Sequence, residues 1–151
     1  MPFHVPKGFK PTAPGFDRDI EISMNYTDWA LSQFFKQAVA QEWYHNTVFV
    51  ITADHTNPYV DNPFQGEGLG RYQVPILIID PGNAALNEKD STLVQQLDII
   101  PSVLDYLKYP KPFFALGNSA WDSLANRFFI TYLSGNYNMI RNGYHIKTKG
   151  F

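Results

Sequence analysis

Two short apolar runs constrain the fold of this chain more than any other feature. "TVFVITA" covers residues 47–53 and "VPILIID" covers residues 74–80, and neither run alternates with polar residues. Unalternating runs of β-branched residues are typical of strands buried on both faces, as in the parallel sheets of α/β proteins. The sequence therefore predicts a layered α/β domain, in which Pro75 is tolerated near the start of the second strand.

The chain changes character near residue 17. Residues 1–16 hold four of the eleven prolines, which predicts an extended lead-in rather than a helix. Apolar side chains then recur at steps of three and four, which predicts a helix over about 17–42 with Asp17 as its N-cap. The expected helical face consists of Ile20, Met24, Thr27, Leu31, Phe34, Phe35 and Ala38.

The second half of the chain predicts one more helix and a small antiparallel sheet. A stripe of leucine and isoleucine predicts a helix over about 98–108, with Asp98 placed to cap it and Pro101 in its first turn. Asn142-Gly143 is a strong signal for a two-residue hairpin within residues 126–151. We expect a single domain over 1–151, made of the lead-in, an α/β part over 17–125 and this β appendage. The stripe consists of Leu97, Ile100, Leu104 and Leu107.

Composition narrows the class of protein. The 151 residues are 44% hydrophobic and 17% charged, which favours a folded globular chain over a disordered one. The formal net charge of -2 gives no reason to expect nucleic acid or an anionic membrane as a partner. No cysteine is present, so thiolate metal sites and a cysteine nucleophile are excluded. No run reaches the roughly 18 apolar residues that span a bilayer, so the chain as given is expected to be soluble.

The first apolar run ends on an Asp-His pair. Asp54 and His55 fall at the carboxyl end of the first expected strand, where ligand sites of open α/β sheets lie. A carboxylate oxygen and an imidazole nitrogen together suit a divalent metal such as Zn or Mn. The pair is equally compatible with a structural role, in which Asp54 caps a turn and His55 is a polar residue at the rim. A metal normally has about four ligands, so the dipeptide alone does not decide between the two.

Four collinear blocks carry a resemblance to a known family. "VFVITADHT", "GRYQVPILIIDPG", "STLVQQLDIIPSVLDYL" and "FFALGNSAW" follow one another, and "IEISMNYTDWALSQFFKQAVAQEWYHNTVFVITADHT" extends the match back, so that it covers about residues 20–120. Their order and spacing resemble the C-terminal half of the alkaline phosphatase-like superfamily, which includes the sulfatases, and the resemblance implies its layered α/β/α fold. Within it they are most similar to phosphoglycerol transferases of the lipoteichoic acid synthase type.

The resemblance implies a metal-dependent enzyme that acts on phosphate or sulfate esters. Asp54 and His55 would be two metal ligands, for Mn or Mg in the transferases and Ca in the sulfatases. The family's nucleophile, a Thr, Ser or modified Cys, belongs to an N-terminal half that is not in this sequence. We therefore expect no catalytic nucleophile here, an inactive isolated chain, and a metal site that two ligands alone cannot fill tightly.

The same resemblance suggests partners and a location. The missing N-terminal half and an ester substrate are the expected partners, and the parent protein is expected at a bacterial cell membrane with its catalytic domain outside the cell. Arg71 can meet an anionic substrate or tie its loop to the sheet, and Thr56 can line the site or make turn hydrogen bonds. An uncovered sheet edge would favour self-association. The alternative is a non-catalytic α/β binding module in which the Asp-His pair is structural.

Overall fold

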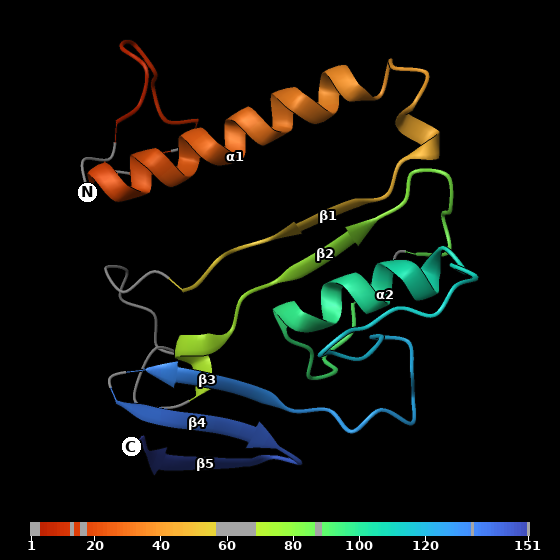
Figure 1. The fold of residues 1–151 in the computed structure, drawn as a ribbon. Helices are drawn as coiled ribbons and strands as arrows, with labels where there is room; N and C mark the ends of the chain where they lie inside the picture. Colours follow the sequence, from red (N-terminus) through yellow and green to blue (C-terminus); the bar gives the residue numbers. More distant parts are fainter. Residues whose placement is uncertain are drawn as a thin grey trace. The chain divides into compact units, whose positions relative to one another are not determined.

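The computed structural model describes residues 4–12, 14–15, 18–56, 69–86, 89–133 and 135–150. Contacts divide the chain into two compact units, one made of residues 1–55 and 74–87 and the other of residues 56–73 and 88–151. The expected single domain with boundaries near residues 16 and 125 stays a prediction. In chain order the elements are α1 (Asp19–Ala38), η1 (Tyr44–Asn46), β1 (Phe49–Thr52), η2 (Leu69–Tyr72), β2 (Ile76–Ile79), η3 (Gln96–Asp98), α2 (Ile99–Tyr106), β3 (Phe129–Leu133), β4 (Asn136–Arg141) and β5 (Tyr144–Lys149), as Figure 1 shows.

Helix α1 begins two residues after the expected cap and ends at Ala38, earlier than predicted. Its N-cap is Arg18, whose backbone N–H donates to Oε2 of Glu21 at 3.2 Å and whose Nε donates to Oε1 at 2.9 Å. Glu21 thereby satisfies one of the backbone donors that a helix start leaves unpaired, and its charge suits the positive end of the helix dipole. Asp17 lies outside the described residues.

Strands β1 and β2 pair with each other, but in the opposite sense to the expectation. They are antiparallel, with Phe49 opposite Ile79 and Thr52 opposite Ile76. The expected parallel sheet is therefore wrong for this pair, because an unalternating apolar run says nothing about strand direction. The carboxyl end of β1 accordingly lies beside the amino end of β2. The expected burial on both faces is not seen either, since Thr52 and Leu77 are exposed and the other residues of both strands are half-buried.

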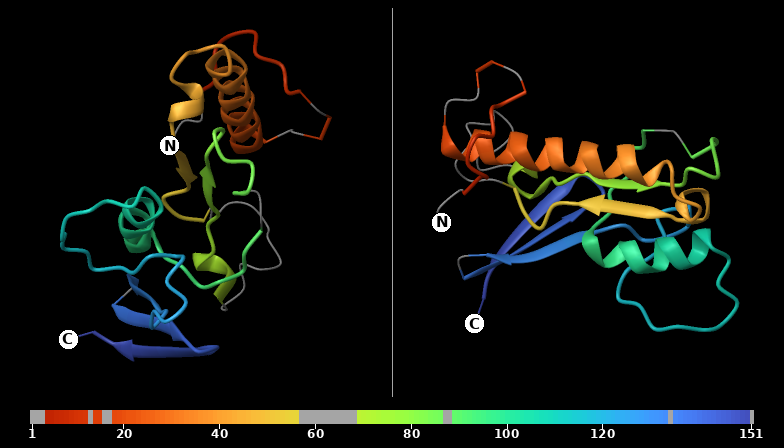
Figure 2. Two further views of the ribbon diagram at one scale, coloured as in Figure 1. Left: turned by 90° about the vertical axis from the view of Figure 1, so that its right-hand side faces the viewer. Right: turned by 90° about the horizontal axis from the view of Figure 1, so that it is seen from above.

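An aromatic cluster joins α1 to this two-stranded sheet. The ring of Phe49 on β1 lies 5.1 Å from that of Phe35 and 6.1 Å from that of Phe34, both on α1. These are edge-to-face arrangements, which aromatic rings prefer and which add to the gain from burial. In the views of Figures 1 and 2, α1 runs alongside β1 and β2.

The described part of the lead-in is held against α1. The ring of Phe9 lies edge-on to that of Tyr26 at 5.1 Å. The backbone N–H of Thr12 donates to Oδ1 of Asn25 at 2.9 Å, and the Asn25 amide donates to the Thr12 hydroxyl at 2.9 Å. Asn25 is buried, so these bonds meet the requirement that a buried amide be paired.

In the second unit, Asp98 stands at the N-cap position of α2, but its side chain makes no cap hydrogen bond to that helix, contrary to the expectation. Its Oδ2 accepts the N–H of Gln95 at 2.9 Å, and its Oδ1 accepts the N–H of Asn118 at 2.8 Å. Ser102, one turn further along α2, accepts the N–H of Ala120 at 2.8 Å. The polar face of α2 thus holds the loop around residues 117–120 in place.

The C-terminal meander agrees with the prediction. Strands β3, β4 and β5 form an antiparallel sheet in that order. Asn142 and Gly143 join β4 to β5 and have φ values of 50° and 78°. Two positive φ values are what a type I′ hairpin turn requires, which explains why Asn-Gly at this position predicts the hairpin.

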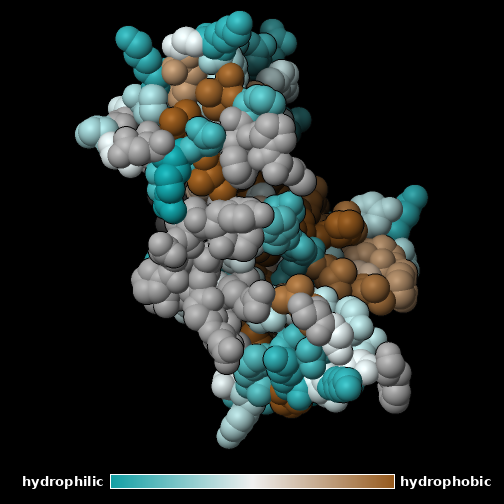
Figure 3. Space-filling model, turned by 90° about the vertical axis from the view of Figure 1, so that its left-hand side faces the viewer, coloured by the Kyte–Doolittle hydropathy of each residue, from teal (hydrophilic) through white to brown (hydrophobic). Residues whose placement is uncertain are grey.

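Both predicted helical stripes are less buried than a helix in a complete core would be. On α1, Met24 and Phe34 are 52% and 47% exposed. Ile100 on α2 and Leu107, the residue that follows α2, are 66% and 56% exposed. The stripes identify residues that share a face, yet the described residues leave these side chains largely uncovered. Figure 3 shows hydrophobic side chains at the surface among hydrophilic ones.

The close approach at Gly117 gives a test of this architecture. A Cβ at Gly117 would collide with the carbonyl oxygen of Leu97 and lie 2.5 Å from Oδ1 of Asp98. We expect Gly117→Ala to lower the free energy of unfolding by about 3 kcal/mol, measured by urea denaturation. Gly135→Ala is the control: φ is 77° there but nothing lies within 4 Å, so the cost should be about 1 kcal/mol. Equal losses for the two variants would contradict the packing described for Gly117.

Candidate functional site

The candidate metal ligands lie just beyond strand β1. The strand ends at Thr52, whose hydroxyl donates to the carbonyl oxygen of Pro75 at 2.8 Å and so ties the strand end to the start of β2. Asp54 and His55 follow on a segment without regular structure. Their side chains are 85% and 73% exposed, respectively, so solvent and dissolved ions reach both.

The two side chains converge rather than point to opposite faces. Nε2 of His55 lies 3.4 Å from Oδ2 of Asp54, and the backbone N–H of His55 donates to Oδ1 of Asp54 at 2.8 Å. Adjacent residues within a strand would diverge, so leaving the strand at Thr52 is what brings these groups together. The N–H bond to Oδ1 orients the carboxylate and turns Oδ2 toward the imidazole.

This separation suits two ligands of one metal ion. Donor atoms that each lie ~2.1 Å from an ion in tetrahedral geometry are ~3.4 Å from one another. An oxygen and an imidazole nitrogen at that distance form a partial site for Zn, Mn or a similar ion. Among the described residues no group of three or more His, Asp or Glu side chains could hold a metal, so this pair could offer an ion two ligands at most.

The other two candidates belong to the second unit. Thr56 directly follows His55, and its side chain is half-buried. Arg71 lies in η2, and its side chain is outside what the structure describes. The structure therefore brings Asp54 and His55 together, while the substrate-binding roles of Thr56 and Arg71 stay predictions. Asp61 and Glu67, which stand between β1 and η2 in the sequence, lie outside the described residues.

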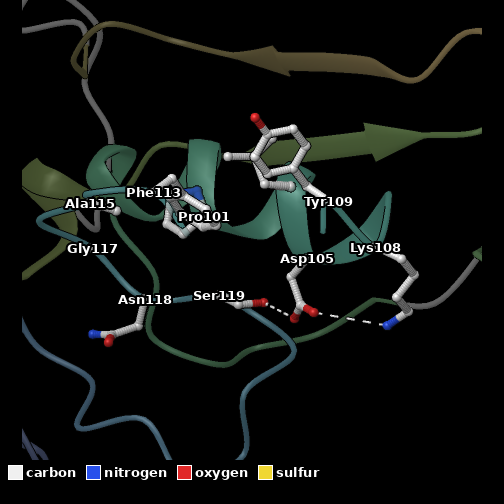
Figure 4. A pocket seen from close by; sticks show the side chains of 10 residues that line it. Pro101, Asp105, Lys108, Tyr109, Phe113, Ala115, Gly117, Asn118 and Ser119 are labelled. Carbon is white, nitrogen blue, oxygen red and sulfur yellow. Dashed lines mark hydrogen bonds and ion pairs between the residues drawn. The ribbon is translucent and has the colours of Figure 1, made fainter. Parts of the chain in front are cut away.

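A pocket of about 660 Å³ lies elsewhere, between α2 and the loop that follows it. Figure 4 shows Asp105 at its wall, where Oδ2 accepts the Ser119 hydroxyl at 2.6 Å and Oδ1 lies 3.9 Å from Nζ of Lys108. The carboxylate of Asp105 thus helps to hold the loop in place. Neither Asp54 nor His55 lines the pocket. We assign the candidate chemistry to the Asp-His pair and not to this pocket.

His145 has a partner on the neighbouring strand that was not among the residues considered from the sequence. Nε2 of His145 on β5 lies 3.1 Å from Oδ1 of Asn138 on β4. A two-residue turn at Asn142-Gly143 places residue 145 opposite residue 140 and diagonal to residue 138. The strand register that the turn sets is therefore enough to bring the two side chains near one another. The contact joins β4 and β5 across the sheet.

Comparisons with known proteins agree with the fold. The family model described as Sulfatase matches residues 10–109, about two thirds of the chain. The chain is also similar to a crystal structure of a protein in the alkaline phosphatase superfamily from Vibrio parahaemolyticus, with a TM-score of 0.78 at 20% sequence identity. That similarity covers 99% of this chain and 36% of the other, so this chain spans about a third of its structural neighbour. It confirms the expected superfamily fold.

The exposure of the pair predicts how it affects folding. We expect Asp54→Asn to change the free energy of unfolding by less than about 0.5 kcal/mol, because the side chain is exposed and the amide oxygen can still accept the His55 N–H. The matched variant Asp98→Asn makes the same chemical change at a buried carboxylate that accepts two N–H groups, and should cost about 1–3 kcal/mol. Chemical denaturation of both variants measures the difference. A large loss for Asp54→Asn would show that the pair has a structural role.

Proposed function

Because this chain belongs to the sulfatase family, we propose that it is part of a metal-dependent enzyme that hydrolyses or transfers phosphate or sulfate esters. The observation that carries the proposal is the 3.4 Å separation of Nε2 of His55 and Oδ2 of Asp54 on a solvent-exposed segment. Two exposed donors of different type, oriented toward one another, can take up an ion without rearrangement of the fold.

In this proposal Asp54 and His55 hold the metal through Oδ2 and Nε2. The bound ion would neutralise charge on the oxygens of an anionic ester. Asp54 contributes negative charge and a hard oxygen, and its second oxygen stays on the His55 N–H, which fixes the carboxylate. Mn or Mg fits a transferase and Ca a sulfatase. The mixed oxygen and nitrogen pair favours Mn, because Mg and Ca prefer oxygen ligands alone.

The rest of the active site belongs to the proposal as well. The nucleophile and the remaining ligands would come from a part of the natural protein outside this sequence, so the isolated chain would be inactive. The resemblance to lipoteichoic acid synthase-type phosphoglycerol transferases favours that branch of the family, with a parent protein at the bacterial cell membrane and its catalytic domain outside the cell. In the described residues no helix is long and apolar enough to cross a membrane.

A second candidate function rests on the same distance. A carboxylate and an imidazole 3.4 Å apart can also form a simple surface ion pair. The chain would then be a non-catalytic binding module in which this pair is structural. Metal binding separates the two candidates, because a surface ion pair has no need of an ion.

Metal removal tests the proposed function in the full-length natural protein. We expect turnover of p-nitrophenyl phosphate or sulfate esters to require Mn, Mg or Ca, to stop with EDTA, and to fall by at least about 100-fold in Asp54→Ala. Calorimetric titration of that variant with Mn should show binding lost. Asp28→Ala, which removes an exposed carboxylate from α1, is the control and should retain both properties. Unchanged metal binding in Asp54→Ala would favour the non-catalytic module, and robust turnover by the 151-residue chain alone would disprove the proposed missing nucleophile.

We also expect the 151-residue chain to self-associate through the uncovered edges of its two-stranded sheet. Strands β1 and β2 form a two-stranded sheet among the described residues, and Leu77 on β2 is 45% exposed. Light scattering should show a mass above that of the monomer for the 151-residue chain, and Leu77→Lys should lower it, since charge on an edge strand opposes pairing. Leu107→Lys places the same charge just after α2, away from this sheet in the chain, and should have no effect. A monomer at high concentration would contradict the expectation.

A further inference from the structure

The two faces of the C-terminal sheet differ in burial. On one face Asn138 and Ile140 are buried, at 3% and 8% exposed. On the other face, called here the outer face, Tyr144 is 75% exposed and Ile146 and Tyr132 are each 56% exposed. Because side chains alternate along each strand, the pairing assigns every residue to a face. The outer face consists of Ile130, Tyr132, Tyr137, Met139, Arg141, Tyr144, Ile146 and Thr148.

The outer face is ordered in rows across the strands. The register places Ile130, Met139 and Ile146 side by side, which forms a purely aliphatic middle row. Tyrosines flank this row on both sides: Tyr132 and Tyr137 lie opposite one another with ring centroids 4.9 Å apart, and Tyr144 lies opposite Arg141 in the other row. Tyrosine has an apolar ring and a polar tip, which suits a boundary between an apolar phase and water.

Charge is divided unevenly along the chain. Residues 123–151 contain four Lys or Arg and no Asp or Glu, whereas residues 1–122 contain eight Lys or Arg and fourteen Asp or Glu. Arg127 uses its guanidinium to bind the carbonyl oxygens of Ala120 and Asp122. Lys147 and Lys149 lie on the exposed edge strand β5, and no carboxylate of the described residues pairs with either. The formal net charge of -2 for the whole chain therefore does not reflect the positive charge of residues 123–151.

We propose that the outer face of the β3–β4–β5 sheet docks on the surface of an anionic lipid bilayer. The aliphatic row would enter the boundary between headgroups and acyl chains, with the tyrosines at headgroup level. Lys147 and Lys149 point to the other face of the sheet, but a surface potential extends about 8 Å at physiological salt, which the long side chains of an edge strand can reach.

The same observations disfavour other occupants. A second copy of the chain would bring two basic segments without carboxylates against each other, which costs like-charge repulsion. A single-stranded nucleic acid stacks successive bases on a run of aromatic rings, whereas here Tyr132 and Tyr137 pack on one another and the aliphatic row separates them from Tyr144. The proposal is independent of the candidate metal ligands, because Asp54 and His55 are not in this sheet.

Vesicle sedimentation with the 151-residue chain tests the proposal. Vesicles of phosphatidylserine in phosphatidylcholine are compared with vesicles of phosphatidylcholine alone, and EDTA is present throughout to exclude metal-dependent binding of lipid by Asp54 and His55. We expect binding to the anionic vesicles only, weakened by added salt. The double variant K147Q/K149Q should lower the partition coefficient by roughly 20-fold, and Y144S/I146S should lower it by at least about 10-fold.

Two matched variants control for charge and for exposed apolar surface. K108Q/K111Q removes the same charge from exposed positions outside the sheet, and F114S/L116S removes apolar side chains that are 88% and 68% exposed. Both should bind vesicles as the unchanged chain does, and circular dichroism verifies that each variant is folded.

Several results would overturn the proposal. These are equal binding to both kinds of vesicle, equal loss in the control variants, or failure of the full-length natural protein to bind when the isolated chain does. Dimerisation or oligonucleotide binding that Y144S/I146S abolishes, without vesicle binding, would assign the face to another partner.

Discussion

The pairing of β1 with β2 determines where the candidate ligands lie. The strands pair in a register that runs from Phe49 opposite Ile79 to Thr52 opposite Ile76. The Thr52 hydroxyl also donates to the Pro75 carbonyl, so the end of β1 is fixed to the start of β2. The backbone leaves the strand directly afterwards, and this change of direction allows two adjacent side chains to meet. A longer strand would have placed Asp54 and His55 on opposite faces of the sheet.

The second unit depends on polar contacts rather than on a large apolar core. Asp98, Ser102 and Asp105 are spaced by four and three residues, so they share one side of the α2 region, and each binds the loop at residues 118–120. Gly117 precedes this loop because no Cβ fits beside Leu97 and Asp98. Leaving a buried donor or acceptor unpaired costs more free energy than forming the hydrogen bond contributes. Alternative positions of the loop, which would leave these groups unpaired, are therefore disfavoured.

Local signals in the sequence predicted local structure well, and contacts across the chain less well. Asn142-Gly143 predicted the β4–β5 turn because few residues accept two positive φ values. The direction of β2 relative to β1 was not predictable from an apolar run, and the bond from Asn118 to Asp98 joins residues twenty apart, beyond the reach of a capping argument. Helical stripes gave the position of α1 and α2 but not their burial, since periodicity says nothing about which surface covers a face. For the candidate site, the sequence located Asp54 and His55, whereas their convergence required the backbone path after Thr52.

The magnitudes of the interactions favour a ligand role for the Asp-His pair over a structural one. An ion pair this exposed contributes about 0–1 kcal/mol, and solvent screening reduces it further. The buried carboxylate of Asp98 accepts two backbone N–H groups, whereas the exposed carboxylate of Asp54 accepts the N–H of its own neighbour, His55. We therefore expect Asp54 and His55 to add less to stability than Asp98 does. The proposed metal binding would use both the exposure of the pair and a separation that one divalent ion can bridge.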